Sequence, residues 1–219
     1  MIDPLTFLGL PLEFRSICKI YPPKVKDIIS NPKAMQLFKL LTYSQEDIED
    51  LLQQDQKDAH GAPDKKIPTP LEFILINSYK NKEFSQLIEE AFQLFIHEPI
   101  TLVYESKLIL IGDVQNLATI TDIKTFRYLS EDTFFEFQNL IRESMGAELA
   151  SIPDPNENAI VKRVKAAGRR RKRLAAKSKK GISLTTSLGA ICCMGIGLTP
   201  LNIGEISYAS IDVIMTLYQ

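Results

Sequence analysis

The amino-acid sequence predicts a mainly α (α+β) fold: a helical N-terminal body with a small β-hairpin, a basic helical arm and a small C-terminal helical module. Three observations support this. Apolar residues recur at helical spacing within the first 150 residues, proline and capping residues mark several helix starts, and the β-rich residues gather in one short stretch. With 219 residues, 45% of them hydrophobic and 24% charged, the chain has the composition of a globular protein.

Four short helices are predicted before residue 81. In "YPPKVKDIIS" the prolines stand where a first helical turn tolerates them, because its amides would be unpaired in any case. Asn31 is expected to be the N-cap of "NPKAMQLFKLL", with Pro32 in the first helical position. Ser44 is expected to cap "YSQEDIEDLLQQ", and Thr69 and Pro70 to begin "TPLEFILINSYK". The polar stretch "DQKDAHGAPDKKIP" between the last two is predicted to be an exposed loop.

The clearest predicted helix begins near Asn81. Its apolar residues recur at i, i+3, i+4, i+7, i+8 and i+11 and form one stripe: Phe84, Leu87, Ile88, Ala91, Phe92 and Phe95. The period then changes, and "ITLVYESKLILIG" predicts a β-hairpin that turns at residues 105–107. A further helix is expected after Ser130 and before Gly146. Its inward residues are expected to be Phe134, Phe137, Leu140 and Ile141.

Three regions are predicted along the chain. Residues 1–150 form the acidic helical body with its hairpin, residues 151–181 form a linker and the basic arm, and residues 182–219 form the small helical module. The body is expected to fold alone. The arm is expected to be helical from about Ala159 only when its charge is neutralised, because Gly168 and like-charge repulsion weaken the helix. In the last region, "SLTTSLGAICCMGIGL" and "SYASIDVIMTLYQ" are expected to pair as a helical hairpin.

Positive and negative charges are divided unevenly between these regions. Residues 1–157 carry 15 basic and 25 acidic side chains, a net charge of −10. Residues 158–219 carry 11 basic and 2 acidic side chains, a net charge of +9. The two parts could attract each other within one chain or between copies, and either could attract another partner.

The basic arm is the candidate partner-binding site. It holds eleven of the 26 basic residues and no acid between positions 162 and 180: Lys162, Arg163, Lys165, Arg169, Arg170, Arg171, Lys172, Arg173, Lys177, Lys179 and Lys180. One interpretation is a solvated helix or tail. A second is contact with phosphates, without sequence preference because no aromatic residue is interleaved for base stacking. A third makes the uncharged residues 181–204 a membrane segment with a positive flank, although their glycines, proline and hydroxyl residues argue against it.

No catalytic or metal-binding signature is present. His60 and His97 have no cysteine or acid at ligand spacing, so a surface or capping role is expected for both. The acids of residues 46–50 lack the central glycine and alternating ligands of an EF-hand and are expected on a solvated helix face. "GIGLTP" lacks the third glycine of a dinucleotide fingerprint, and neither a Walker lysine motif nor a G-x-S-x-G elbow occurs. We therefore predict a protein without enzymatic activity and without a cofactor.

The cysteines and the N-terminal residues indicate the cellular compartment in which the protein is expected. Cys18, Cys192 and Cys193 offer no even disulfide framework, which favours a reducing compartment. The first residues, "MIDPLTFLGLPLEF", lack a basic region before an apolar core and do not read as a signal peptide.

Three stretches resemble the tail assembly chaperones (tail-region proteins) of long-tailed bacteriophages. "IYPPKVKDIISNPKAMQLFKLLTYSQEDIED" and "TPLEFILINSYKNKEFSQLIEEAFQLFIHEPITLVYESKLILIGD" are similar to the body of those proteins. The third stretch, "KAAGRRRKRLAAKSKKGISL…LTPLNIGEISYASIDVIMTLYQ", is similar to their basic connector and terminal module. The resemblance spans most of the chain.

The resemblance implies a non-enzymatic role in the cytoplasm of the infected bacterial host. Proteins of that family bind the long, aggregation-prone tape-measure protein and help recruit tail-tube subunits. Many are made in a short and a long form by ribosomal frameshifting, and only the long form carries the C-terminal module. Two alternatives stay open: a nucleic-acid-binding phage virion or accessory protein that uses the basic arm, and a single-pass membrane-anchored protein.

Overall fold

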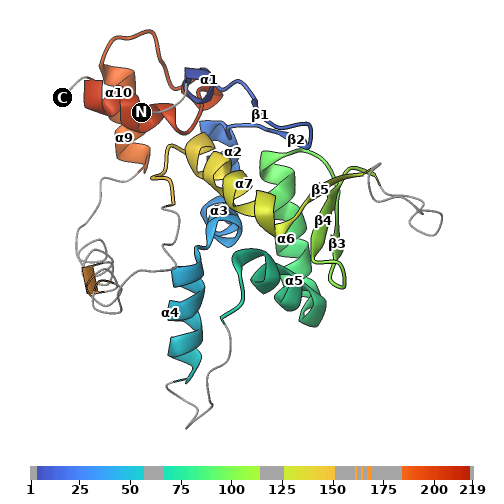
Figure 1. Cartoon of the computed structure of the whole chain (residues 1–219). Coiled ribbons are helices and arrows are strands. Elements are labelled where there is room, and N and C mark those ends of the chain that lie inside the picture. Colours follow the sequence, from blue (N-terminus) through green and yellow to red (C-terminus); the bar gives the residue numbers. More distant parts are fainter. Residues whose placement is uncertain are drawn as a thin grey trace.

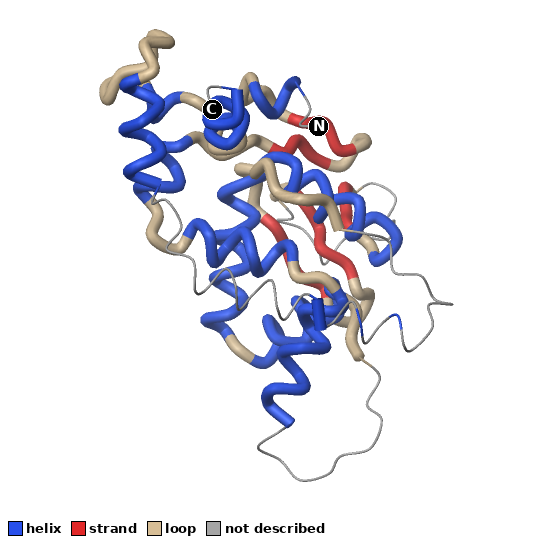
Figure 2. Tube along the Cα trace, turned by 90° about the vertical axis from the view of Figure 1, so that its left-hand side faces the viewer, coloured by secondary structure: helices blue, strands red, loops and turns tan. Residues whose placement is uncertain are grey.

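A computed structural model describes residues 4–56, 67–113, 126–150, 161, 164, 167–168 and 184–217. These residues form a mainly α structure with two small antiparallel sheets, as the sequence predicts (Figures 1 and 2). The central helices are α3 (Ala34–Thr42), α5 (Pro70–Lys80), α6 (Lys82–Phe95) and α7 (Glu131–Ser144). Helix α6 packs against α3 and α5, and α3 also packs against α7. Rings from α6 and α7 meet in the middle of this packing, where Phe92 and Phe137 stack with their centroids 5.5 Å apart.

The two predicted apolar stripes face this core. Ile88, Ala91, Phe92 and Phe95 of α6 are buried, as are Phe134, Phe137 and Ile141 of α7. Phe84, Leu87 and Leu140 are partly buried and pack against the same cluster. The chain leaves α7 at Gly146, whose φ of 68° is the left-handed conformation that glycine adopts without strain.

Three of the predicted helix starts are confirmed. The Thr69 hydroxyl accepts a hydrogen bond from Glu72 N at 3.3 Å at the start of α5. The Asn81 side chain accepts from Glu83 N at 2.8 Å at the start of α6. Before α4 (Gln45–Gln56), the Ser44 hydroxyl accepts from Asp47 N at 3.1 Å.

Two predicted helix starts are wrong by a few residues. Helix α2 (Val25–Ser30) begins after Lys24, and both prolines of "YPPKVKDIIS" therefore precede it. The N-cap of α3 is Lys33 and not Asn31, so Pro32 is not in its first position. Asn31 lies instead in the turn that joins the two helices, where its side chain accepts a hydrogen bond from Lys33 N at 3.0 Å. Asn31 is also the C-cap of α2, and its N–H donates to the Asp27 carbonyl at 3.2 Å.

The predicted hairpin belongs to a three-stranded sheet in the order β3-β4-β5. Strands β3 (Ile100–Val103) and β4 (Leu108–Ile111) pair antiparallel, as predicted, and β5 (Arg127–Leu129) adds to β4. A second hairpin, which the sequence analysis did not predict, pairs β1 (Leu12–Phe14) with β2 (Cys18–Ile20).

The C-terminal helices pack against each other, as predicted, and also against the body. Helices α9 (Leu184–Cys193) and α10 (Ser210–Leu217) contact each other, and the short 3-10 helix η3 (Ile203–Glu205) contacts α2. A second apolar cluster joins these elements: Val25, Ile191, Ile203, Ile211 and Ile214. Val25 comes from the body and is completely buried in this cluster.

Hydrogen bonds join the segment between η3 and α10, and the first residue of α10, to the body. Val25 N donates to the Ile206 carbonyl at 3.0 Å, and Tyr208 N donates to the Pro23 carbonyl at 2.8 Å. The Ser210 hydroxyl donates to the carbonyl of Phe7, the last residue of α1 (Pro4–Phe7), at 2.8 Å, and α1 lies next to α10 in Figure 1. The division into residues 1–150, 151–181 and 182–219 stays a prediction. Its third region, residues 182–219, is in contact with the first region through these hydrogen bonds.

Some predictions fall on parts of the chain outside the described residues. They include most of the loop between α4 and α5 and the linker after Ala150.

Within the described ranges, no helix combines the length and the apolar content that crossing a bilayer requires.

Candidate functional site

The eleven basic side chains of the arm all lie outside the described residues, so the structure places none of them. Of the segment around them it describes Val161, Val164, Ala167 and Gly168, and all four are helical and exposed. Val161 has 44% of its surface exposed and Val164 has 67%. Since residues three apart share a helix face, the two valines form an uncovered apolar stripe beside the basic run.

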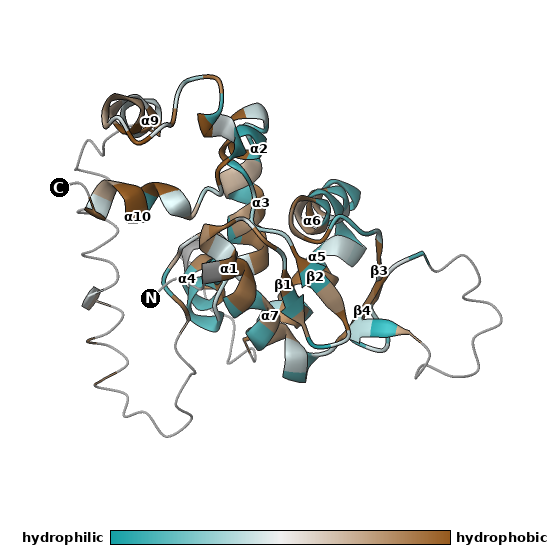
Figure 3. Cartoon of the chain, turned by 90° about the horizontal axis from the view of Figure 1, so that it is seen from above, coloured by the Kyte–Doolittle hydropathy of each residue, from teal (hydrophilic) through white to brown (hydrophobic). Residues whose placement is uncertain are grey.

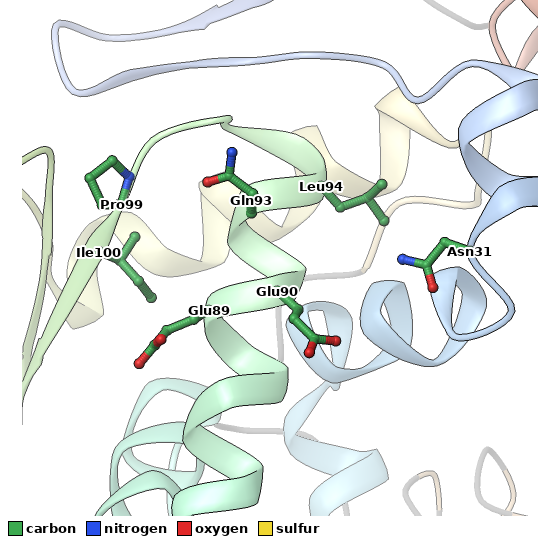
Figure 4. A pocket seen from close by; sticks show the side chains of 7 residues that line it. All are labelled: Asn31, Glu89, Glu90, Gln93, Leu94, Pro99 and Ile100. Atoms are coloured by element: carbon green, nitrogen blue, oxygen red, sulfur yellow. The ribbon is translucent and has the colours of Figure 1, made fainter.

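A groove on the body carries the opposite charge. We call it the acidic groove; it has a volume of about 570 Å³ and runs across the outward side of α6 (Figure 4). Its apolar lining is Leu94, Pro99 and Ile100, and its polar lining is Asn31, Glu89, Glu90 and Gln93. Figure 4 shows the two carboxylates between an apolar end at Pro99 and Ile100 and another end at Leu94 and Asn31.

The helical period of α6 explains why acids line this groove. Its inward stripe is apolar, and its outward residues Glu83, Gln86, Glu89, Glu90 and Gln93 are exposed. Figure 3 shows this division as hydrophobic colour on the inner side of α6 and hydrophilic colour on its outer side. Lys33 is paired with the groove, and its Nζ lies 3.9 Å from Glu90 Oε2. That distance is an ion contact and is too long for a hydrogen bond.

A second candidate surface is apolar and lies at the N-terminal end of the described chain. We call it the N-terminal apolar surface; it consists of Leu5, Phe7, Leu8 and Leu10, whose exposed fractions are 43%, 40%, 66% and 46%. The segment is a compact turn, because Leu10 N donates to the Leu5 carbonyl at 2.8 Å. Four large apolar side chains exposed within six residues are typical of a contact surface. The sequence analysis missed it, although the run "LTFLGL" was its signal.

Two tyrosines form a third exposed feature. Tyr79, near the end of α5, is 77% exposed, and Tyr104, in the turn after β3, is 47% exposed. Their rings stack with centroids 5.0 Å apart. The pair holds the hairpin turn against α5, together with the ion pair of Lys107 and Glu72 at 2.6 Å.

The strongest charge cluster among the described residues joins η3 to α2. Glu205 accepts hydrogen bonds from Lys26 Nζ at 2.7 Å and from Lys24 Nζ at 2.9 Å. The bond from Lys26, followed by the bond from Lys24, lowers the pKa of Glu205 to about 2. This cluster connects two parts of the fold and is a structural contact.

Arg142 is a partly buried cation of α7. Burial lowers its pKa, and the nearby charge of Asp47 acts in the opposite direction. Its Nη2 donates to the Thr42 carbonyl, at the end of α3, and its Nη1 lies 3.5 Å from the Glu148 carbonyl oxygen. Arg142 thus ties α3 to the chain that follows α7.

The histidines and cysteines form no reactive centre in the part of the chain that is described. His97 is exposed at the end of α6 and stacks on Tyr21 with centroids 4.5 Å apart, while His60 lies outside the described residues. Cys18 is buried, and burial raises the pKa of its thiol to about 12. Across the described residues, no group of three or more His, Cys, Asp or Glu side chains is placed to hold a metal ion.

Comparisons of the chain with protein-family models, with curated proteins and with solved structures found no match.

Proposed function

We propose that this chain is a non-enzymatic tail assembly chaperone of a long-tailed bacteriophage. In this proposal it binds the tape-measure protein, helps recruit tail-tube subunits, and acts in the cytoplasm of the infected host. The observation that carries the proposal is the resemblance of residues 20–50, 69–113 and 165–219 to the body, connector and terminal module of those proteins.

The N-terminal apolar surface supports the proposal. A tape-measure protein presents long amphipathic helices, and a holding protein needs an exposed apolar surface against which such a helix can lie. Leu5, Phe7, Leu8 and Leu10 provide one on a folded body. Each of these side chains is only partly exposed, so the contact is modest and can be released when the tube assembles.

Co-expression with the tape-measure protein of the same phage tests this role. We expect the chain to keep the tape-measure protein in the soluble fraction, and the double variant Leu8→Ser, Leu10→Ser to lose this effect. The matched control is Leu201→Ser, because Leu201 is 97% exposed but lies outside the surface. A tape-measure protein that is equally soluble with and without the chain would remove the basis of the proposal.

A second candidate function rests on the basic run alone. Eleven cations in 19 residues without an acid would bind the phosphates of a nucleic acid, with an affinity that falls steeply as salt rises. Retention on random duplex DNA at low salt, lost at high salt, would favour this function over the first.

A further inference from the structure

We propose that the outer edge of strand β3 binds an extended segment of a partner protein that carries lysine or arginine at alternate positions. We call this side of Ile100–Val103, which faces away from β4, the β3 edge. The bound segment adds a fourth strand to the three-stranded sheet and lies in the acidic groove. This contact does not depend on the proposed chaperone function.

The pairing of β3 with β4 determines which backbone groups point to the β3 edge. Gly112 N donates to the Pro99 carbonyl at 2.9 Å, and the strand register places these two residues opposite each other. Hydrogen-bonded pairs alternate with non-bonded pairs along an antiparallel ladder. The next bonded position of β3 is therefore Thr101, and the N–H and C=O groups of Ile100 and Leu102 point away from β4.

The described part of the fold leaves the β3 edge unpaired. In the order β3-β4-β5, β3 is an outer strand, and no other strand of the described residues pairs with it. All four residues of β3 are partly exposed, whereas three of the four residues of β4 are buried. An outer strand whose N–H and C=O groups lack partners is a template for one more strand.

The acidic groove lies beside this edge. Seen from above in Figure 3, β3 lies on the side of β4 that faces α6, so the β3 edge faces α6. Pro99 and Ile100 line the groove on the side of the sheet, and Glu89 and Glu90 line it on the side of α6. Figure 4 shows the Glu89 side chain on the side of α6 that faces β3. A strand added to β3 therefore lies between the sheet and these carboxylates.

The carboxylates determine the chemistry of the partner. Side chains of directly paired residues in neighbouring strands lie on the same face of a sheet, and successive side chains of one strand alternate between the faces. Ile100 and Leu102 pack against the core cluster to which α6 contributes. Every second side chain of the added strand is thus directed toward α6, where Glu89 and Glu90 lie. Lysine or arginine at these positions places cations next to the two carboxylates.

The same charges disfavour a second copy of this chain as the occupant. Strand β3 has the sequence ITLV, so β3 of another copy brings no cation to the carboxylates. A symmetric pairing of two β3 strands also brings the Glu89 and Glu90 side chains of both copies toward one junction, where like charges repel. A partner strand with alternating cations avoids both costs.

Synthetic peptides added to the full-length chain test the contact. The probe is an acetylated and amidated hexapeptide of alternating lysine and valine. One control peptide has glutamate in place of lysine, and a second control carries an N-methyl group on every backbone amide. N-methylation removes the N–H donors that strand pairing requires and keeps the positive charge.

Charge reversal in the protein complements the peptide controls. The groove variant is Glu89→Lys, Glu90→Lys. The matched control variant is Asp132→Lys, Glu148→Lys, which changes the net charge equally at two exposed acids near the ends of α7 that do not line the groove. Circular dichroism verifies that each variant is folded, and calorimetric titration to about 1 mM peptide gives the dissociation constant.

We expect wild type and the control variant to bind the lysine–valine probe with a dissociation constant on the order of 100 μM. The groove variant should bind it about tenfold more weakly, because two exposed charge contacts change from attraction to repulsion. Neither control peptide should bind measurably. In NMR hydrogen exchange, the amides of Ile100 and Leu102 should exchange faster than that of Thr101 in the free chain and should slow when the probe is added.

Several results would overturn the proposal. A probe that does not bind, or that binds the groove variant as it binds wild type, would show that the carboxylates select no such segment. Equal binding of the N-methylated peptide, or unchanged exchange at Ile100 and Leu102, would show that the probe is held by charge without strand pairing. Slow exchange of both amides before the probe is added would show that the β3 edge is already covered, by a second copy if the slowing grows with protein concentration. Because the assay contains no tape-measure protein and no tube protein, none of these results bears on the proposed chaperone function.

Discussion

Deleting residues 151–219 tests how far the body is independent of the C-terminal helices. The first core cluster survives this deletion, since its buried members all lie between Leu12 and Met145. The second cluster does not survive, because four of its five buried residues are removed and Val25 is left without cover. The truncated body is therefore expected to fold but to be less stable than the full chain.

The cost follows from what the deletion exposes. Uncovering Val25, which is completely buried, costs about 1.5–3 kcal/mol. The two backbone hydrogen bonds to Ile206 and from Tyr208 contribute about 0.5–1.5 kcal/mol each. The sum is about 2.5–6 kcal/mol, which for a chain of this size lowers the melting temperature by roughly 5–24 °C.

Thermal melting of residues 1–150 beside the full chain, followed by circular dichroism, measures this cost. The expected result is a cooperative transition at a lower temperature. A non-cooperative melt would refute the separate body. A transition at the temperature of the full chain would refute the stabilising role of the contacts to Val25.

Two further predictions concern the core and the charge cluster. Phe137→Ala should destabilise the chain by about 3–5 kcal/mol in chemical denaturation, because Phe137 is completely buried between other rings. The control Phe7→Ala should cost clearly less, because the Phe7 side chain is 40% exposed. Equal losses of stability in the two variants would contradict the assigned core. Because the pKa of Glu205 is lowered to about 2 in the folded chain, its contribution to stability is present above the ordinary carboxyl pKa and is lost as the pH falls toward 2. Glu205→Gln should therefore flatten the loss of stability between about pH 5 and pH 2, and unfolding curves identical to wild type at every pH would show that the cluster contributes nothing.

The parts of the fold that the sequence could predict are those with a strong local signal. The stripe from Phe84 to Phe95 repeats over three turns, and Asn81 caps it with a side-chain hydrogen bond. Thr69 and Pro70 mark the next helix equally clearly, because capping depends only on residues within one turn. Such features need no knowledge of the rest of the chain.

The β-strands that were missed lack a local signal. Strands β1, β2 and β5 have three residues each, too few for an alternating pattern to be recognised. The turn between β1 and β2 places Arg15 at φ 50°, a left-handed conformation that usually calls for glycine or asparagine, so the sequence carries no turn signature there. Strand β5 is defined by its pairing with β4, which is a tertiary contact.

The candidate surfaces also differ in whether a local sequence signal marks them. The basic arm was predicted from composition alone, and its side chains lie outside the described residues. The acidic groove was not predicted, because it brings Asn31 next to α6 and the start of β3, which are far from it in the sequence. The docking of η3 and α10 onto Val25 was likewise out of reach, since nothing local marks Val25 as different from other apolar residues.

Capture of three partners in parallel tests the chaperone proposal most directly. The full-length chain and an arm variant are immobilised separately; the variant replaces five residues by Ser: Arg169, Arg170, Arg171, Lys172 and Arg173. Each is incubated with the tape-measure protein and the tail-tube protein of the same phage, and with duplex DNA of random sequence. We predict that both forms retain the tape-measure protein and that only the wild type retains the tube protein, because the apolar surface belongs to the folded body and the charge to the arm. Retention of DNA by the wild type alone, without capture of the tape-measure protein by either form, would contradict the proposal.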